Sequence, residues 1–353
     1  MVDPAECPSG GAIDKGSFVK ILIYSRAFWP SVGGLETIMQ ILAEEFTKAG
    51  HHVTVVTEIS STGERECNYS VLRSPGLGGL VKALRESDVC LSANVSLRGL
   101  GPMLIAGRPV VISHHGVYGS PNQVSLGTVL KNTVTRFSKN ICVSRAVQLG
   151  IPGGSIVIPN TYDNDTFKEY DDVLRDRDIV FVGRLVSDKG VTDLISALGH
   201  LARKGMFPKL TIIGDGPERS VVEKQINELG LSGQIGLAGT KRGRDLAKLV
   251  ARHRVMAVPS RWAEPFGVAA LEGIACGCVV VGTNLGGLPE AIGPCGITVD
   301  NGDSEAIARA LESLLGNERL RQHYRSGARD HLARHSRSTV SKMYLDVLRS
   351  VAA

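Results

Sequence analysis

Short β-branched runs alternate with segments of helical period along most of the chain, and this alternation predicts doubly wound parallel sheets. The first predicted strands are near-continuous in Val, Ile and Leu, as strands buried on both faces are. They span residues 19–25, 52–58, 88–92, 109–113, 140–143 and 155–159. Helices are predicted between them, over residues 34–50 and 123–138.

A second alternating series follows residues 160–178, a polar and acidic segment that is predicted to be a linker. Its predicted strands span residues 179–183, 209–214, 235–238, 255–259, 279–282 and 297–299, and its last helices span 304–315, 318–334 and 338–351. Two similar series in tandem predict two sheets with a cleft between them. Ligands of such sheets bind beyond the carboxyl ends of the strands.

The composition changes this picture little. At 353 residues two domains are expected, and 43% hydrophobic with 21% charged residues is typical of a soluble globular protein. Residues 1–16 lack the basic start and apolar stretch of a secretory signal, so a flexible arm is predicted there. The seven cysteines show no metal-ligand spacing, which favours reduced core thiols and a cytoplasmic location.

The charge is unevenly placed, although the net charge is only +5. Residues 89–162 contain no Asp or Glu, and their basic residues are Arg98, Arg108, Lys131, Arg136, Lys139 and Arg145. No helix-turn-helix, zinc or aromatic-platform signature accompanies them, so nucleic acid is a poor partner. An anionic acceptor or an acidic membrane surface fits better, and scattered solvated charge is the alternative.

Three glycine-bearing turns lie between a predicted strand and a predicted helix. Gly33 and Gly34 allow the backbone to approach a phosphate, and the N-terminus of the following helix would attract that phosphate. The alternative is that this pair forms only a tight turn. In the run from Gly183 to Gly190, Arg184 can fork two phosphate oxygens and Lys189 can add a point charge. A similar junction at Gly214 and Gly216 is explained by turn chemistry alone, with nucleotide contact as a second interpretation.

The strongest motif is a pair of glutamates, Glu264 and Glu272, with seven residues between them. Glu264 precedes a Pro–Phe–Gly turn, and Glu272 lies about one and a half turns into the next helix. A carboxylate at the helix mouth can accept hydrogen bonds from sugar hydroxyls, and the second can take the paired hydroxyls of a ribose. Between them the helix N-terminus can face a phosphate.

At this point the sequence resembles the family-four retaining glycosyltransferases of the GT-B fold, in which two Rossmann-like domains face each other across a cleft. The resemblance covers residues 19–351. It rests on Glu264 and Glu272, on the run from Gly183 to Gly190, and on Gly33–Gly34. A strand-end histidine matches His115, with His114 as the adjacent competitor, and Asn160 lies in a segment where Thr161 replaces the usual glycine.

The resemblance implies transfer of a sugar from a nucleoside diphosphate, with retention of configuration and without an essential metal or cofactor. It implies an acceptor-binding domain at residues 17–170, a donor-binding domain at 171–335, and a helix at 336–353 that crosses back onto the first domain. The implied catalytic residues are His115, Arg184, Lys189 and Glu264. The implied donor-binding residues are Gly33, Gly34, Gly183, Gly214, Gly216, Phe266, Gly267, Val268 and Glu272, with His114, Asn160, Lys241 and Arg242 as further candidates.

Other functions remain open at this stage. A nucleotide-sugar epimerase of the same fold would need no acceptor, and a non-catalytic nucleotide-sugar-binding protein would keep the fold without turnover. A UDP-sugar is favoured over a GDP-sugar. The acceptor is expected to be a hydroxyl compound, anionic or lipid-linked on the charge pattern, and the same pattern favours peripheral contact with the inner face of a membrane.

Overall fold

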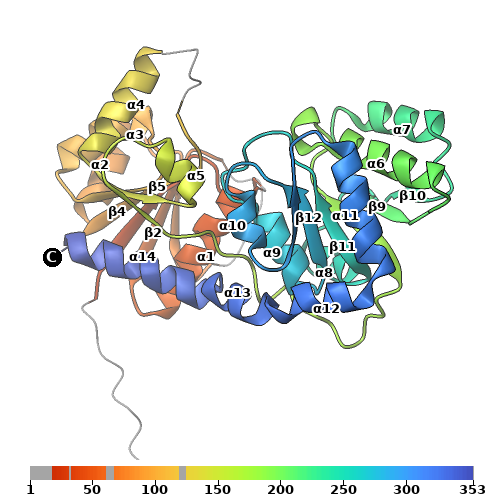
Figure 1. The fold of residues 1–353 in the computed structure, drawn as a ribbon. Coiled ribbons are helices and arrows are strands. Elements are labelled where there is room, and N and C mark those ends of the chain that lie inside the picture. Colours follow the sequence, from red (N-terminus) through yellow and green to blue (C-terminus); the bar gives the residue numbers. More distant parts are fainter. Residues whose placement is uncertain (1–17, 32, 61–66, 119–124, 353) are drawn as a thin grey trace, which may run out of the picture.

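The computed structural model describes residues 18–31, 33–60, 67–118 and 125–352. The predicted arm at residues 1–16 and Cys7 therefore lie outside the described residues. Two α/β halves lie side by side, the first in red to yellow and the second in green to blue in Figure 1. Among the described residues, every helix is too short or too polar to span a bilayer.

The first half contains a parallel sheet of seven described strands in the order β3-β2-β1-β4-β5-β6-β7. These are β1 Lys20–Tyr24, β2 His52–Thr57, β3 Ser70–Arg73, β4 Val89–Ala93, β5 Val110–His114, β6 Lys139–Cys142 and β7 Ser155–Val157. Its helices are α1 Gly34–Lys48, α2 Leu77–Arg85, α3 Leu97–Ala106, α4 Leu126–Arg136 and α5 Arg145–Leu149.

The second half contains a parallel sheet of six described strands in the order β10-β9-β8-β11-β12-β13. These are β8 Arg177–Val182, β9 Leu210–Ile213, β10 Ile235–Leu237, β11 His253–Val258, β12 Val279–Thr283 and β13 Gly296–Val299. Around it lie the 3₁₀ turn η1 Ser187–Lys189 and the helices α6 Val191–Arg203, α7 Arg219–Glu228, α8 Gly243–Ala251, α9 Val268–Ala275, α10 Leu288–Ile292, α11 Ser304–Gly316, α12 Glu318–Ser326, α13 Ala328–Arg334 and α14 Arg337–Ala352.

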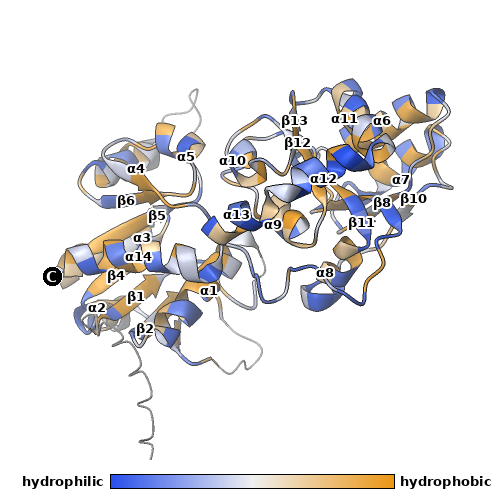
Figure 2. Ribbon diagram, turned by 60° about the horizontal axis from the view of Figure 1, so that its bottom comes forward, coloured by the Kyte–Doolittle hydropathy of each residue, from blue (hydrophilic) through white to orange (hydrophobic). Residues whose placement is uncertain are grey.

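Both faces of each sheet are covered by apolar side chains, which explains the near-continuous hydrophobic strands. In β1, Ile21 and Ile23 belong to the core beneath α1 and α14, whereas Leu22 and Tyr24 belong to a second core beneath α2 and α3. The central strands of the first sheet are accordingly orange in Figure 2. All the strands predicted from the hydrophobic pattern are present, and the described cysteines carry free thiols as predicted.

One predicted helix is wrong. The single helix expected over residues 318–334 is two helices, because α12 ends at Ser326 and α13 begins at Ala328. Gly327 forms the junction and lies so close to Pro294 that a Cβ there would come within 2.9 Å of the proline ring. The chain therefore bends where glycine allows it to pass the proline.

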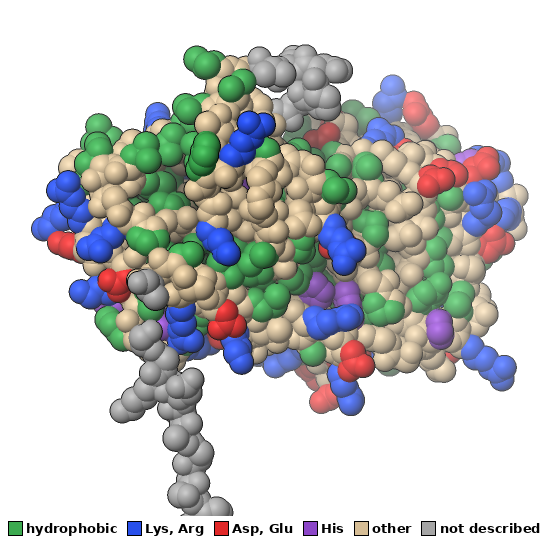
Figure 3. Space-filling view, turned by 60° about the vertical axis from the view of Figure 1, so that its left-hand side comes forward, with side chains coloured by type: hydrophobic (Ala, Val, Ile, Leu, Met, Phe, Trp, Pro, Cys, Tyr) green, Lys and Arg blue, Asp and Glu red, His purple; other side chains and the backbone are tan. Residues whose placement is uncertain are grey.

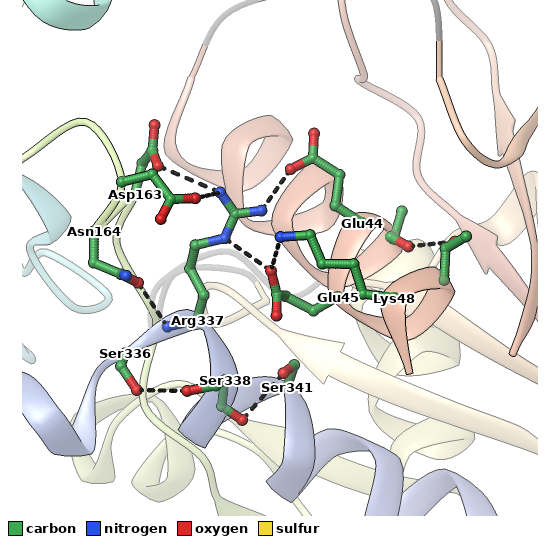
Figure 4. A network of polar contacts seen from close by, with 12 residues as sticks. Glu44, Glu45, Lys48, Asp163, Asn164, Ser336, Arg337, Ser338 and Ser341 are labelled. Atoms are coloured by element: carbon green, nitrogen blue, oxygen red, sulfur yellow. Dashed lines mark hydrogen bonds and ion pairs between the residues drawn. The ribbon is translucent and has the colours of Figure 1, made fainter. Parts of the chain in front are cut away.

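The last helix returns to the first half and is tied there by one arginine. Arg337, at the start of α14, has a side chain only 9% exposed. Its guanidinium donates to Glu44 at 2.5 Å and Glu45 at 3.2 Å on α1, and to Asp165 at 2.9 Å in the segment between the halves (Figure 4). One side chain thus joins three parts of the chain that are far apart in sequence.

We expect Arg337→Ala to lower the free energy of unfolding by about 3 kcal/mol, because it leaves the α1 carboxylates without their shared partner in a poorly solvated site. Thermal and urea unfolding measure the loss. Arg337→Lys should recover only part of it, since an ammonium cannot reproduce the fork. The exposed Arg329→Ala is the matched control, and an equally stable Arg337→Ala protein would contradict the prediction.

Candidate active site

The predicted site residues of the second half follow neighbouring strands. β9, β8, β11 and β12 are adjacent and parallel, so the loops after their carboxyl ends meet at one edge of the sheet. These loops begin at Gly214, Gly183, Pro259 and Asn284. Residues more than a hundred positions apart in sequence are therefore brought to one place.

Two of these loops are joined by an ion pair. The ammonium of Lys189 lies 2.5 Å from Oε1 of Glu264, and the two side chains are only 27% and 12% exposed. The hydroxyl of Ser260 donates to the same carboxylate oxygen at 2.7 Å. Thr283, at the end of β12, in turn donates to the carbonyl of Ser260 at 2.8 Å. The Glu264 carboxylate is thereby fixed at the mouth of α9.

The loops approach each other backbone to backbone at glycines. Gly190 has φ +65, and a Cβ there would lie 1.9 Å from the carbonyl oxygen of Pro259. Gly214 has φ +144, and its Cβ would lie 1.8 Å from the carbonyl oxygen of Gly183. No other residue fits at these two positions, because the backbone itself occupies the space.

Sequence reasoning missed the loop after β12. Gly287 donates its N–H to the carbonyl of Glu264 at 2.7 Å, and a Cβ on Gly286 would lie 2.3 Å from the same oxygen. The Gly286–Gly287 pair follows a strand and precedes a short helix, the pattern by which Gly33–Gly34 was recognised. The same pattern in the sequence could therefore have identified the loop after β12.

The start of α9 lies between the two halves. Phe266 is 1% exposed, and its ring centroid lies 5.5 Å from that of His335. Gly267 takes φ +110 as the residue before the helix, and no side chain caps it. Val268 packs against the core of the first half, as Leu35 of α1 does. The carbonyl of Pro265 also accepts a hydrogen bond from Ser144, after β6, at 2.7 Å.

Glu272 and Arg184 differ sharply in environment. Burial, together with the nearby negative charge of Asp163, raises the pKa of the Glu272 carboxyl to about 8. The group is therefore largely protonated at neutral pH in the ligand-free protein. Arg184 is exposed directly after β8, and it forms no ion pair with any residue that the structure describes.

The two histidines of the first half have separate environments. His114 is fully buried and is held by the Tyr118 hydroxyl at 2.8 Å and by Asn140 at 2.9 Å. His115 follows β5 and lines a cavity of about 580 Å³ together with Leu35, Asn94, Tyr118 and Lys131. The geometry therefore favours His115 as the residue that faces a ligand.

A chain of hydroxyls orients the His115 ring. Its Nε2 lies 2.9 Å from the Ser113 hydroxyl, which lies 2.7 Å from the hydroxyl of Tyr344 on α14. The backbone N–H of His115 donates to Oδ1 of Asn94 at 2.8 Å. Burial and the neighbouring His114 lower the pKa of His115 to about 3, so its imidazole stays neutral.

The glycines at the start of α1 have a different character. Gly33 is extended, at φ −171, and needs no glycine for its backbone conformation. A Cβ on Gly34 would meet no described atom within 4 Å. Neither glycine is therefore needed for a left-handed turn. The space next to Gly34 at the start of α1 is open.

Comparison with known proteins is informative at this point. The sequence profile described as glycosyl transferases group 1 matches residues 163–331. A phosphatidylinositol N-acetylglucosaminyltransferase component of Arabidopsis thaliana is 25% identical over 84% of this chain and 74% of that protein. The N-acetyl-alpha-D-glucosaminyl L-malate synthase of Bacillus anthracis is 25% identical over 91% of this chain and 96% of that protein. Residues 163–331 of this chain belong to the glycosyl transferases group 1 family.

The fold of this glycosyltransferase is GT-B. The crystal structure of Anabaena Alr3699/HepE in complex with UDP and glucose has a TM-score of 0.78 and 21% identity, with 94% of this chain and 100% of that chain covered. The fold and family expected from the motifs are confirmed. The protein is an enzyme that transfers a sugar from a nucleotide sugar.

The remaining candidates of the glycosyltransferase lie in two places. Asn160 is buried, and its carbonyl faces Nδ1 of His335 at 3.2 Å. Lys241 and Arg242 are exposed directly before α8. Beyond them, three cations pair with acids near the start of the second half: Lys248 of α8 with Asp172, Arg252 after α8 with Asp176, and Arg254 of β11 with Asp178 of β8.

We predict that Gly190→Ala in this glycosyltransferase loses most activity and stability, whereas Gly205→Ala keeps its activity and loses only about 1–2 kcal/mol of stability. Both glycines have positive φ, which costs alanine about 1–2 kcal/mol, but a Cβ on Gly205 meets no described atom within 4 Å. At position 190 the clash with Pro259 must push apart the loops that carry Lys189 and Glu264. Urea unfolding and a transfer assay compare the variants, and equal losses would refute the packing role.

Proposed function

We propose that the enzyme transfers a hexosyl or N-acetylhexosaminyl residue from a UDP-sugar to a hydroxyl acceptor, with retention of anomeric configuration. The observation that carries this proposal is the fixed Lys189–Glu264 pair at the mouth of α9, with the exposed Arg184 at the start of the loop that carries Lys189. Cations and a carboxylate at the end of one sheet suit a pyrophosphate attached to a sugar.

In this mechanism the leaving diphosphate is held by Arg184 and Lys189. Main-chain N–H groups of Phe266, Gly267, Val268 and Gly34 add partial positive charge at the starts of α9 and α1. The bond between the sugar and the phosphate oxygen breaks as the acceptor oxygen bonds to the same face of the sugar. The acceptor proton passes to the leaving phosphate oxygen, so no protein nucleophile is assigned.

The donor sugar would be held by Glu264 and His115. The contacts of Glu264 with described side chains use Oε1, which leaves Oε2 to accept from a sugar hydroxyl. If Tyr344 donates to Ser113 and Ser113 to Nε2 of His115, the imidazole proton lies on Nδ1 and can donate to a sugar oxygen. Glu272 would take the ribose hydroxyls.

We assign donor binding to residues 171–335 and acceptor binding to residues 17–170, with 336–353 as the helix that returns to the first half. The cavity of His115 shares Glu58 with a second cavity of about 550 Å³ lined by Tyr24, Arg98 and Leu77. Glu58 lies 3.2 Å from Arg98 and 3.4 Å from Arg26. Together with Lys131, these cations favour an anionic acceptor.

A UDP-sugar is favoured because the HepE structure holds UDP and glucose, and because the names of both relatives include an N-acetylglucosaminyl group. A GDP-sugar is the alternative. Arg184 and Lys189 would supply the charge that a metal supplies elsewhere, so activity without an essential metal or cofactor is proposed. The free thiols of the described cysteines favour a cytoplasmic enzyme, peripheral at the inner membrane face.

Arg184→Ala and Glu272→Ala are expected to reduce transfer about 10²–10³-fold or more while the protein stays folded, because charge on the leaving group and donor orientation are lost. A thermal-shift panel of UDP, GDP, ADP and TDP identifies the nucleotide, and sugar transfer is then measured with and without EDTA.

Four results would contradict the proposal. Undiminished turnover by either variant would remove the assigned roles, and loss of activity in EDTA would remove metal independence. Incubation with the donor alone separates the alternatives, because an epimerase converts it without acceptor. A protein that binds nucleotide but never turns over any donor would be a sensor.

Donor affinity should rise with pH between about 6 and 8. Ribose hydroxyls donate to a carboxylate, so binding favours ionised Glu272, whose pKa is about 8 without ligand. The donor KM should fall by up to tenfold per pH unit and level off above pH 8. For the same group, stability of the ligand-free protein should decline as pH rises from 4.5 to about 8, because the native state holds the proton longer.

Glu272→Gln should bind the donor weakly, with a high donor KM that does not change between pH 6 and 8. The exposed Glu305→Gln serves as the control and should keep the wild-type profile. A wild-type donor KM that is flat from pH 6 to 8 would show that Glu272 does not contact the donor as a carboxylate.

A further inference from the structure

Helix α4 presents its apolar side to solvent. Leu126, Val129, Leu130 and the following Phe137 lie on one stripe at helical spacing, and Leu126 and Phe137 are 86% and 87% exposed. Thr135 is its only buried residue in the structure as described, and Asn132 and Thr128 are only partly exposed. A helix that merely packs on a protein has the opposite polarity, with its apolar stripe inward.

Apolar residues of neighbouring elements extend this stripe. A Cβ on Gly127, in the first turn of α4, would lie 3.6 Å from Leu97, at the start of α3, and Leu104 and Ile105 are exposed at the other end of α3. A Cβ on Gly150 would meet Val117, next to the exposed Leu149. We call this set the apolar surface: Leu97, Leu104, Ile105, Val117, Leu126, Val129, Leu130, Phe137 and Leu149. Hydrophobic side chains gather at the upper left of Figure 3, over this region.

The charge around the apolar surface has one sign. All its residues fall within residues 89–162, which contain no Asp or Glu, and Arg136 and Lys139 are exposed beside Phe137. Acids that share a cavity or a contact with this region have partners of their own: Glu58 pairs with Arg26 and Arg98, Glu86 pairs with Lys82, and Glu290 accepts from the N–H of Arg145. An anionic partner therefore meets attraction without opposition.

We propose that the apolar surface docks the enzyme on an anionic lipid bilayer, with α4 lying in the interface. Exposed Leu and Phe enter the acyl boundary while Arg136 and Lys139 meet the headgroups, which is the composition of an interfacial helix. A second copy of the chain fits less well, because two such surfaces would bring like charges together. Soluble monomers rarely leave so many large apolar residues together in water.

Docking places the acceptor cavity at the membrane. Val117 belongs to the apolar surface, and both Val117 and Lys131 of α4 line the cavity of His115. A lipid headgroup can therefore enter the cavity without the lipid leaving the bilayer. This consequence rests on the proposed function, whereas the docking itself does not.

The test is vesicle flotation of the full-length protein. Phosphatidylcholine vesicles with about 30% phosphatidylglycerol should bind it, and pure phosphatidylcholine vesicles should bind little. Leu126→Ser with Phe137→Ser should reduce binding about tenfold, and Arg136→Ser should reduce it mainly at low salt. None of these residues is assigned to the active site, so transfer to a water-soluble acceptor should not change.

Matched controls are the exposed Leu174→Ser with Phe207→Ser, and Arg329→Ser, all in the second half or the segment before it. These variants should bind like wild type. Binding that is equal on neutral vesicles, or that survives the α4 substitutions, would overturn the docking surface. So would self-association in light scattering that the α4 substitutions abolish, because a second copy would then occupy it. Loss of docking with intact transfer separates this inference from the proposed function.

Discussion

The second half depends on one ion pair, between Lys189 and Glu264. β8 and β11 are hydrogen-bonded neighbours, so the loops that follow them emerge side by side. The ion pair joins these two loops, with 2.5 Å between Nζ of Lys189 and Oε1 of Glu264. Removing either partner would leave a charge in a poorly solvated place, where an unpaired charge is costly. The same pair is the basis of the donor-binding role proposed for these loops. Because the protein fold has already oriented these charges, a nucleotide sugar would meet charges that need little reorganisation on binding, the condition under which electrostatic stabilisation is strongest.

The first half is organised from the other end of the chain. α14 contributes Tyr344 to the hydroxyl chain that orients His115, and Arg337 fixes α14 to α1 and to the segment between the halves. The ring of His115 thus depends, through Ser113, on a tyrosine that lies 231 positions beyond that serine. A change in how α14 lies on the first half would therefore reach His115 without altering any residue of the second sheet.

The sequence predicts the strands well because buried parallel strands are continuously apolar, and it predicts fewer of the other elements. β3 is an edge strand whose residues are exposed or only partly buried. Glycines lower the helix propensity in the first turn of α2, at Gly78 and Gly79, and α3 contains Gly99, Gly101 and Pro102. For the site, motif spacing singled out Glu264, Lys189 and Arg184 separately. That Lys189 pairs with Glu264, and that Tyr344 orients Ser113, follows only from tertiary structure, since no local signal relates residues so far apart.

Helix α4 also shows what the sequence alone does not reveal. Its apolar spacing is that of an ordinary packing helix, and only the exposure of Leu126 and Phe137 reveals that the stripe points outward. In Figure 1, α4 projects at one end of the first half and α14 runs along the other. A bilayer at α4 would then lie away from the Arg337 network, which could hold the frame rigid while lipid contacts the opposite side. The acid-free stretch of the sequence and the outward stripe of α4 thus have a single explanation, because both are what a protein surface needs to rest on anionic lipid.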